Sequence, residues 1–480
     1  MNRRVMGAIL AAGAIVVASY PSVSVGKALA AQSIKWRPCA NAPTVECGTL
    51  EVPVDWQNPS GEKINLVLAR HLATDKKRRI GILLVNPGGP GGSGTKLAKQ
   101  ADRRYSEDIR ARFDIIGFDP RGIGESNPVS CDATKDDPAM SYFPRDQAAF
   151  DRLVARNRAV GESCQARTGE LLEHLDSNDV ARDIDSIRKA LGETKLNWLG
   201  LSYGTMLGTA YAEHFPNHIR AMALDGAMDH SLSETAMLAT EAATAEDGFN
   251  RFSGWCSTDK TCALHGEKVG DVYDQLINRA NRTPIRTPDP HRSVSGDEIQ
   301  HNTQGMLGPG ISGWPALARA IKQADAGDAS AFVTGPSSGQ SFRYSAWSIS
   351  CLEFGGESAT YGDISTRELL ARNVAPHLGG AVQTWDSVAD CIGWPAPQTN
   401  PAHPLVFHDL PPILIVNANH DPSTSYVWAQ GLAAQMPGST LLTREGDGHT
   451  SYNTPGCART AIEHYLIDFA LPPPATTCPN

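Results

Sequence analysis

The feature that most constrains the fold of this 480-residue chain is a short apolar run that passes directly into a helical pattern. Residues 195–201 (KLNWLGL) have the character of a buried strand, and residues 203–215 carry apolar side chains at helical spacing. Ser202 stands between them, in the sequence GLSYG. A strained strand–turn–helix presents a serine hydroxyl above a sheet, while flanking glycines relieve crowding around it. The stretch therefore predicts that Ser202 is a nucleophile.

The same Gly-x-Ser-x-Gly pattern occurs again at residues 335–339 (GPSSG), so the pattern alone does not select the serine. Ser337 follows a proline, and no helical pattern begins after it. This composition is typical of a loop. We therefore assign the second match to a loop and retain Ser202.

Other short apolar segments end at loops, as the buried strands of a largely parallel sheet do. They alternate with segments of helical spacing, and this alternation predicts an α/β fold with helices on both faces of the sheet. The expected strands are residues 63–73, 80–86, 113–119, 195–201, 219–225, 411–421 and 439–445, and the expected helices include residues 177–192, 203–215 and 458–470.

The first 30 residues have the pattern of a secretory signal peptide. Arg3 and Arg4 precede an apolar stretch, residues 5–18, and Ala-Leu-Ala at 28–30 is a small-x-small cleavage site. The apolar stretch is too short to span a bilayer, so we expect a cleaved signal and no membrane anchor. The sequence therefore predicts a secreted protein.

From residue 230 to residue 405 the sequence is helical in character, with frequent Gly and Pro and few strand-like runs. We expect this segment to be a helical cap inserted into an α/β core formed by residues 31–229 and 406–480. The length after the signal exceeds what one hydrophobic core usually organises. Such a cap would lie over the carboxyl ends of the strands, where the sites of α/β proteins lie.

All ten cysteines follow the signal, and an even count in an exported chain predicts up to five disulfides. Pairing each cysteine with its neighbour is one of many possible connectivities. It would join Cys39 to Cys47, Cys131 to Cys164, Cys256 to Cys262, Cys351 to Cys391 and Cys457 to Cys478. No zinc-type spacing of Cys or His is present, so we expect no metal and no cofactor. The formal net charge of −9 also argues against a nucleic-acid partner.

A serine nucleophile needs a base and an acid, which on this fold follow it in the order acid, then histidine. His449 lies in a glycine-flanked loop after the last expected strand, whereas His464 lies within a helical pattern. Asp421 ends the strand of residues 411–421, and Asp225 is the alternative acid at the end of an earlier strand. We predict His449 as the base and favour Asp421 as the acid.

The oxyanion of an acyl-transfer intermediate needs two backbone donors. One is expected to be the N–H of Tyr203, directly after the nucleophile. The other should come from the loop after an early strand, in residues 82–94 (ILLVNPGGPGGSG), where glycines let the backbone approach a substrate. We assign it to Gly89, within one residue. The loop has no phosphate-binding spacing.

Taken together, five segments in this order resemble the α/β-hydrolase serine peptidases of the prolyl aminopeptidase clan, and most closely the secreted tripeptidyl aminopeptidases of actinobacteria. They are NPGGPGGSG (86–94), GFDPRGIGESNP (117–128), GLSYGT (200–205), NANHDPSTS (417–425) and GDGHTSY (446–452). The resemblance implies a secreted exopeptidase that acts on peptides with a free N-terminus and releases short peptides, with cap helices over its site. Thr205 and the Asn86-Pro87 start of the glycine loop depart from the intracellular relatives.

The resemblance also implies acidic cap residues that bind the substrate α-ammonium. Glu353 is the candidate, because it follows a cysteine that a disulfide would fix, and Glu357 is a weaker one. Arg121 is expected to be a structural tie for the oxyanion loop. A carboxylesterase or lipase with the same triad is the alternative function, since the chemistry of acyl transfer is shared. A hydrolase fold that only binds is a third possibility, which the intact catalytic residues oppose.

Overall fold

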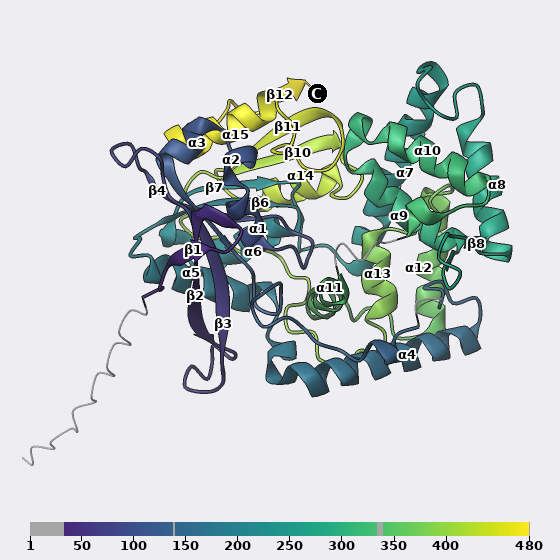
Figure 1. Cartoon of the computed structure of the whole chain (residues 1–480), viewed down its shortest axis with the longest axis horizontal. Coiled ribbons are helices and arrows are strands. Elements are labelled where there is room, and N and C mark those ends of the chain that lie inside the picture. Colours follow the sequence, from purple (N-terminus) through teal and green to yellow (C-terminus); the bar gives the residue numbers. More distant parts are fainter. Residues whose placement is uncertain (1–32, 138–139, 334–338, 480) are drawn as a thin grey trace, which may run out of the picture.

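The computed structural model describes residues 33–137, 140–333 and 339–479; the expected signal peptide and Ser337 lie outside the described residues. Its main sheet has ten strands (Figure 1). They are β1 (Arg37–Cys39), β2 (Ala42–Pro53), β3 (Lys63–His71), β4 (Gly81–Asn86), β5 (Phe113–Phe118), β6 (Leu196–Leu201), β7 (Ile219–Asp225), β10 (Leu414–His420), β11 (Thr440–Asp447) and β12 (Thr477–Pro479). The spatial order is β1-β2-β3-β5-β4-β6-β7-β10-β11-β12.

The sheet is mostly parallel. The pairs among β1, β2, β3 and β5 are antiparallel, and the other neighbours run parallel. Leu201 pairs with Asp225, and Asp225 pairs with Val416, so the carboxyl ends of β6, β7 and β10 meet at one edge. The predicted α/β architecture is confirmed, and this edge is where its loops can converge.

Helices cover both faces of the sheet, as the alternation of patterns predicted. In β6, Trp198 belongs to the hydrophobic core on one face, whereas Leu199 and Leu201 belong to the core on the other. Successive strand residues point to opposite faces, which explains why the central strands are apolar throughout. The first face is covered by α5 (Ser177–Ala190), α6 (Tyr203–His214) and α14 (Tyr426–Gln435), and the second by α1 (Gly94–Lys99), α2 (Ala101–Arg104), α3 (Glu107–Arg112) and α15 (Cys457–Asp468).

Strands β1, β2 and β12 are additions to the predicted sheet, and each lacks a long apolar run. Along β2, Glu46 and Glu51 alternate with the buried residues Val45 and Leu50. This alternation is typical of an antiparallel strand with one face in water. β12 has only three residues, which are held beside β11 while Cys478 is joined to α15 by a disulfide.

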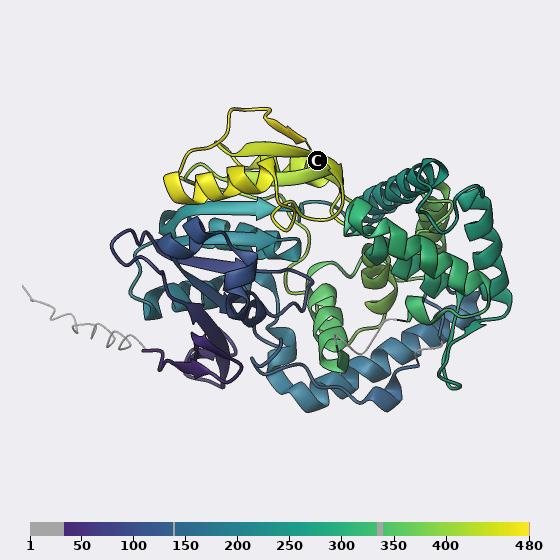
Figure 2. The ribbon, with the colours of Figure 1, turned by 45° about the horizontal axis from the view of Figure 1, so that its top comes forward.

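The segment between β7 and β10 is mainly helical and lies to one side of the sheet (Figures 1 and 2). We call its helices the cap helices. They are α7 (Glu234–Thr258), α8 (Val269–Arg282), α9 (Gly296–Leu307), α10 (Trp314–Asp325), α11 (Gly339–Glu353), α12 (Tyr361–Val374) and α13 (Gln383–Asp390). A short hairpin of β8 (Ile285–Arg286) and β9 (Ser293–Val294) accompanies them.

The cap helices have a hydrophobic core of their own, which includes Phe249 and Phe252. Packing crosses the limits of residues 230–405 in both directions. Phe150 of the long helix α4 (Gln147–Thr168) joins the core of the cap, and Trp347 of α11 joins the core of the sheet. Two helices thus connect the cap to the sheet by apolar contacts.

All ten cysteines are paired, and each is joined to its neighbour in the sequence. The disulfides are Cys39–Cys47, Cys131–Cys164, Cys256–Cys262, Cys351–Cys391 and Cys457–Cys478. The neighbour-pairing hypothesis is confirmed. Among the described residues, none of the helices has the length and apolar character needed to cross a bilayer.

Candidate active site

Ser202 forms the turn between β6 and α6, and its backbone is strained. Its φ of 57° and ψ of −129° fall in a region that residues other than glycine rarely adopt. The Ser202 N–H donates to the carbonyl of Asp225 at 2.9 Å, and the Ser202 carbonyl accepts from the N–H and the hydroxyl of Thr205, each at 2.7 Å. These bonds fix a conformation that strain alone would not sustain. Strain of this kind is characteristic of a serine nucleophile at a strand–helix turn.

The glycines on either side of Ser202 allow the chain to fold back on itself. A Cβ on Gly200 would lie 2.2 Å from the carbonyl oxygen of Gly204, and a Cβ on Gly204 would lie 2.9 Å from the carbonyl oxygen of Asn86. These neighbours are backbone atoms, which cannot rotate out of the way. The Gly-x-Ser-x-Gly pattern therefore reflects the close contact of α6 with β6 and β4.

His449 and Asp421 meet from the loops that follow β11 and β10. The Nδ1 atom of His449 lies 2.9 Å from Asp421 Oδ2 and 3.0 Å from Oδ1. Asp421 has no exposed surface, and it accepts the N–H groups of Ser423 and Thr424 at 2.8 and 2.9 Å. An imidazole held through Nδ1 by a buried carboxylate keeps Nε2 for proton exchange.

The imidazole of His449 lies against the end of β7, next to the residue that anchors Ser202. A Cβ on Gly226 would be 3.2 Å from Cε1 of His449. Gly226 directly follows Asp225, whose carbonyl binds the N–H of Ser202. The structure thus brings Ser202, Asp421 and His449 to one edge of the sheet.

The pKa values of the pair follow from its geometry. Burial alone would raise the pKa of Asp421, but the charge and hydrogen bond of His449, together with the backbone donors, hold it below its ordinary value. Burial alone would lower the pKa of His449, and the Asp421 carboxylate outweighs burial and raises it. An imidazolium formed during a reaction would be stabilised by the same contact.

The alternative acid, Asp225, has a different set of partners. Its carboxylate accepts the N–H groups of Ser451 and Tyr452 at 2.7 to 2.9 Å and shapes the loop that carries His449. Burial raises the pKa of Asp225 to about 6. Through its carbonyl and its carboxylate, this one residue connects the turn at Ser202 with the histidine loop.

The predicted oxyanion loop lies against the turn at Ser202. A Cβ on Gly88 would be 2.4 Å from the carbonyl oxygen of Leu201 and 2.8 Å from the nitrogen of Tyr203. The N–H of Gly88 donates to the Asn86 side chain and the N–H of Gly92 donates to the carbonyl of Gly88, so neither competes with Gly89 as the predicted second donor. The N–H of Tyr203 is in the first turn of α6, where it has no intrahelical partner.

Asp119 supports the oxyanion loop from β5. Its carboxylate accepts from the hydroxyl of Ser93 at 2.6 Å and from the N–H of Thr95 at 3.1 Å. Arg121, which was expected to tie this loop, instead binds Asp183 of α5 and the carbonyls that end β2. Arg121 is a structural tie, but of β2 to α5.

Glu353, predicted to bind the substrate α-ammonium, is enclosed by polar groups of the protein. Glu353 has no exposed surface, and its carboxylate accepts the N–H of Ser177 at 2.5 Å, the hydroxyl of Tyr203 at 3.2 Å and the side-chain amide of Asn400 at 2.6 Å. These partners all belong to the protein, and the role of Glu353 toward a substrate ammonium stays a prediction. Burial, together with the charge of Asp176, raises the pKa of Glu353 to about 8. Glu357 instead accepts the N–H of Glu234 and pairs with Arg367.

Thr424 is a site residue that the sequence patterns missed. Its hydroxyl donates to Asp421 Oδ2 at 2.9 Å and lies 3.3 Å from Nδ1 of His449. The signal was present, because a hydroxyl residue three positions after an aspartate commonly binds that side chain in a turn.

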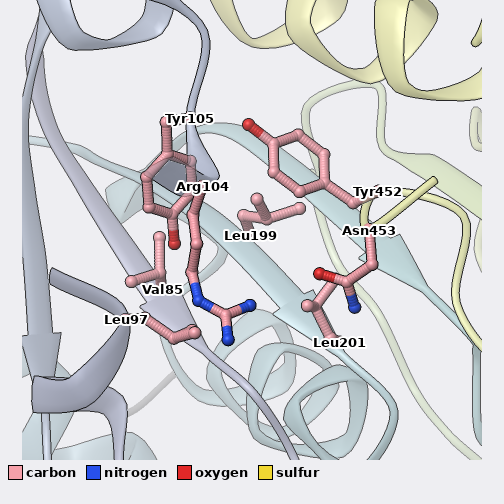
Figure 3. Close-up of a pocket in the computed structure, with 8 residues that line it drawn as sticks. All are labelled: Val85, Leu97, Arg104, Tyr105, Leu199, Leu201, Tyr452 and Asn453. Atoms are coloured by element: carbon pink, nitrogen blue, oxygen red, sulfur yellow. The ribbon is translucent and has the colours of Figure 1, made fainter. Parts of the chain in front are cut away.

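A small pocket lies on the second face of the sheet, beside the end of β6 (Figure 3). Leu201, the residue before Ser202, contributes to its wall, and Figure 3 shows the guanidinium of Arg104 between Leu97 and Leu201. The other lining residues are Val85, Tyr105, Leu199, Tyr452 and Asn453.

Among the described residues, one group has three side chains spaced to hold a metal ion, and it consists of Asp55, Glu170 and His174. His174 already binds Asp179 through Nδ1 at 2.9 Å. Clustered acidic groups are common in proteins without a metal, and no role is assigned to this group.

Comparisons with known proteins agree with this geometry. The sequence model of a family described as "TAP-like protein" matches residues 375–478, the part that contains Asp421 and His449. "Serine protease Hip1" of Mycobacterium tuberculosis is 33% identical over 98% of this chain and 96% of its own length. "Carboxylesterase B" of the same organism is 32% identical over 91% and 86%. "Tripeptidyl aminopeptidase" of Streptomyces lividans is 29% identical over 90% and 84%.

These relatives align with 90% to 98% of this chain, and the family model covers both loops that carry the acid and the base. The sheet topology and the strained serine turn are those of an α/β hydrolase. The chain is therefore a serine hydrolase, and it belongs to the family of TAP-like α/β hydrolases that includes serine protease Hip1 and the tripeptidyl aminopeptidases.

Proposed function

We propose that the enzyme is a serine peptidase that forms an acyl-enzyme on Ser202, with His449 as base and Asp421 as the acid that orients it. The observation that carries the proposal is the bond from His449 Nδ1 to Asp421, beside the strand end that anchors the strained Ser202. In the first step Ser202 Oγ attacks the substrate carbonyl and its proton passes to His449 Nε2. The Asp421 carboxylate stabilises the resulting imidazolium.

The remaining steps use the same groups. The N–H groups of Tyr203 and Gly89 bind the oxyanion of the tetrahedral intermediate. His449 then gives its proton to the leaving amine, and the peptide bond breaks to leave the acyl group on Ser202. Water, deprotonated by His449, attacks the ester and releases the acid product and the free serine.

We further infer that the substrates are peptides with a free N-terminus, from which a short peptide, a tripeptide, is released. The likeness to the tripeptidyl aminopeptidase over 90% of this chain supports this inference. The five disulfides support an extracellular site of action, which agrees with the signal pattern of the first 30 residues.

A carboxylesterase is the second candidate, because a relative of that name matches at 32% identity. The two functions are separated by comparing a free tripeptide anilide, its N-acetylated form and a simple aryl ester as substrates. Loss of anilide cleavage on acetylation is expected for the exopeptidase. Cleavage that is indifferent to acetylation, with fast ester turnover, would favour the esterase.

The nucleophile is tested with the Ser202→Ala variant. We expect its activity on the tripeptide anilide to fall by about 10³-fold or more, because no other group can form the acyl-enzyme. A folded Ser202→Ala variant that keeps wild-type activity would overturn the proposed mechanism.

A further inference from the structure

Helix α7 of the cap presents a row of polar side chains to the loops that carry Asp421 and His449. The row consists of Thr240, Thr244, Asp247 and Arg251, and we call it the α7 row. The spacings of four, three and four residues place all four side chains on one face of the helix. The figures show α7 beside the part of the sheet formed by β10 and β11 (Figures 1 and 2).

Two members of the α7 row bind the acid loop at and beside Asp421. The hydroxyl of Thr244 donates to the carbonyl of Asp421 at 2.9 Å. Asp247 Oδ2 lies 2.7 Å from Nδ1 of His420, the residue before Asp421. Gly248 allows this close approach, since a Cβ there would be 3.3 Å from Cβ of Pro422.

The ends of the α7 row bind the elements that flank the acid and base loops. Arg251 pairs with both carboxylate oxygens of Asp447, two residues before His449, at 2.5 and 3.0 Å. Thr240 accepts from the indole of Trp428 at 2.7 Å, in the helix that follows the acid loop. The row thus spans both loops from one rigid element.

Other cap residues complete the same contact. The N–H of His449 donates to the carbonyl of Gly308 at 2.7 Å, so the cap binds the backbone of the base directly. The side-chain amide of Gln304 donates to the carbonyl of Pro422 at 3.0 Å. The backbone at and beside Asp421 and His449 is therefore hydrogen-bonded to residues of the cap.

The opposite face of α7 explains why these contacts are rigid. Leu238, Ala242, Ala245, Phe249 and Phe252 are buried in the hydrophobic core of the cap. A helix fixed by its apolar face holds its polar face at a constant distance from what it binds. Exposed ion pairs add little to global stability, but a shift of about 1 Å in catalytic groups can cost about 10²-fold in rate.

We propose that α7 is a positioning element of the catalytic centre: the α7 row holds the Asp421 and His449 loops in register, so the cap sets the geometry of the acid–base pair in addition to covering it. The inference rests on the proposed roles of Asp421 and His449. Thr244 and Arg251 are its central members, because they bind the acid itself and the strand end that leads to the base.

The test uses Thr244→Val and Arg251→Met in the full mature enzyme, each with a conservative partner, Thr244→Ser and Arg251→Lys. Matched controls are Thr366→Val, which removes a hydroxyl bond within α12, and Arg279→Met, which removes an ion pair between α8 and α10. The measurements are kcat and KM on the tripeptide anilide and on p-nitrophenyl acetate, the rate of fluorophosphonate labelling, and the thermal unfolding midpoint.

We expect Thr244→Val to lower kcat and the labelling rate by about 10- to 100-fold with KM and the unfolding midpoint unchanged. Thr244→Ser should recover most of the rate. Arg251→Met should behave similarly, with partial recovery in Arg251→Lys. The controls should stay within about twofold of the wild type, since neither contact involves the catalytic loops.

The pH profile separates positioning from a general loss of structure. The groups that act on the charge of His449 are Asp421, Asp225 and Glu241. Because Asp421 raises the pKa of His449, loosening their contact lowers it and moves the acidic limb of kcat/KM to lower pH. Thr244 carries no charge, so such a shift in Thr244→Val reports on geometry alone.

The inference is overturned if Thr244→Val and Arg251→Met match the controls in kcat and in the acidic limb, or if they lose activity only in proportion to lost folded protein. The inactive Ser202→Ala and His449→Ala variants anchor the comparison. If those two variants stay active, the proposed function fails. If they are inactive while the α7 variants behave as wild type, only the role of α7 fails.

Discussion

The turn at Ser202 and the loops that carry Asp421 and His449 share one edge of the sheet, yet they are held in different ways. The turn is fixed by the core: Ser202 binds the carbonyl of Asp225, and Gly200 and Gly204 pack against neighbouring backbone. The His449 loop binds Asp225 of the core on one side and Gly308 of the cap on the other, and the Asp421 loop binds Thr244 of α7. The nucleophile is thus built into the sheet, whereas the acid and base depend on two parts of the molecule.

The largest expected effect is a loss of kcat that distinguishes Asp421, in the acid loop, from Asp225, in the core. Asp421→Asn should lower kcat by about 10³- to 10⁴-fold, because the amide neither stabilises the imidazolium nor holds its tautomer. The pKa of His449, which Asp421 raises, should fall, so the remaining activity should extend to lower pH. The measurement is kcat/KM on the tripeptide anilide across pH.

Asp225→Asn is the matched comparison for that variant. Its side-chain oxygen can still accept from the loop at Ser451 and Tyr452, so we expect a loss of about 10-fold or less. A loss in Asp225→Asn that exceeded the loss in Asp421→Asn would mean that the core aspartate is the catalytic acid. The contrast between turn and loops would then be wrong.

Two glycine-to-alanine variants compare the turn at Ser202 with the His449 loop, because each adds a single Cβ atom at one of these places. At Gly204 a Cβ would lie 2.9 Å from backbone of β4, so Gly204→Ala should destabilise the fold by about 1–3 kcal/mol. At Gly226, with φ of +69°, a Cβ would lie 3.1 Å from the Thr424 hydroxyl and 3.2 Å from the His449 ring. We expect Gly226→Ala to lower kcat by about 10- to 100-fold through displacement of the ring.

Gly192→Ala is the control for the backbone strain at Gly226. Gly192 has a similar φ of +72°, but a Cβ there would meet nothing within 4 Å. Both variants therefore share a conformational cost of about 1–2 kcal/mol, and only Gly226→Ala adds the contact with His449. Unfolding in urea and kcat are measured for all three variants. Equal kcat in Gly192→Ala and Gly226→Ala would show that the loop tolerates the added atom.

The same contrast explains which parts of the molecule the sequence predicts. The turn at Ser202 is local: its strand, glycines and helix lie within about 20 consecutive residues, and the central strands are apolar on both faces. The loop residues Asp421 and His449 also follow strands, so chain order was sufficient to propose them as a pair, and the structure places their side chains in contact. Neighbouring cysteines paired correctly because their segments are adjacent in the fold.

What the sequence does not predict depends on contacts between distant segments. Thr244 lies 177 positions from Asp421. Nothing in the sequence around Thr244 indicates that its hydroxyl binds a residue so far along the chain. Strand β2 was not predicted, because its charged and apolar residues alternate and form no continuous apolar run. Glu353 shows the same problem in reverse: its support by a disulfide is visible in the sequence, but the enclosure by Ser177, Tyr203 and Asn400 is not.

The smallest expected effect on activity concerns Glu353, a cap residue that contacts the turn at Ser202 through the hydroxyl of Tyr203. Its pKa is raised to about 8 in the folded protein, against about 4.3 in an unfolded chain. Between these values the folded state binds the extra proton, so this group makes stability fall as pH rises from about 4.5 to about 8. Glu353→Gln cannot ionise and should lose that part of the decline, by a few kcal/mol at most.

The measurement is the free energy of unfolding in urea at pH 5 and pH 8.5 for the wild type, Glu353→Gln and the exposed control Glu162→Gln. The wild type and the control should lose more stability than Glu353→Gln over this interval, while activity at neutral pH changes little. An equal decline in all three proteins would mean that Glu353 is already ionised at pH 5 among its donors. The turn at Ser202 would then be bound by a charged cap residue over the whole pH range, and it would be as dependent on the cap as the loops that it faces.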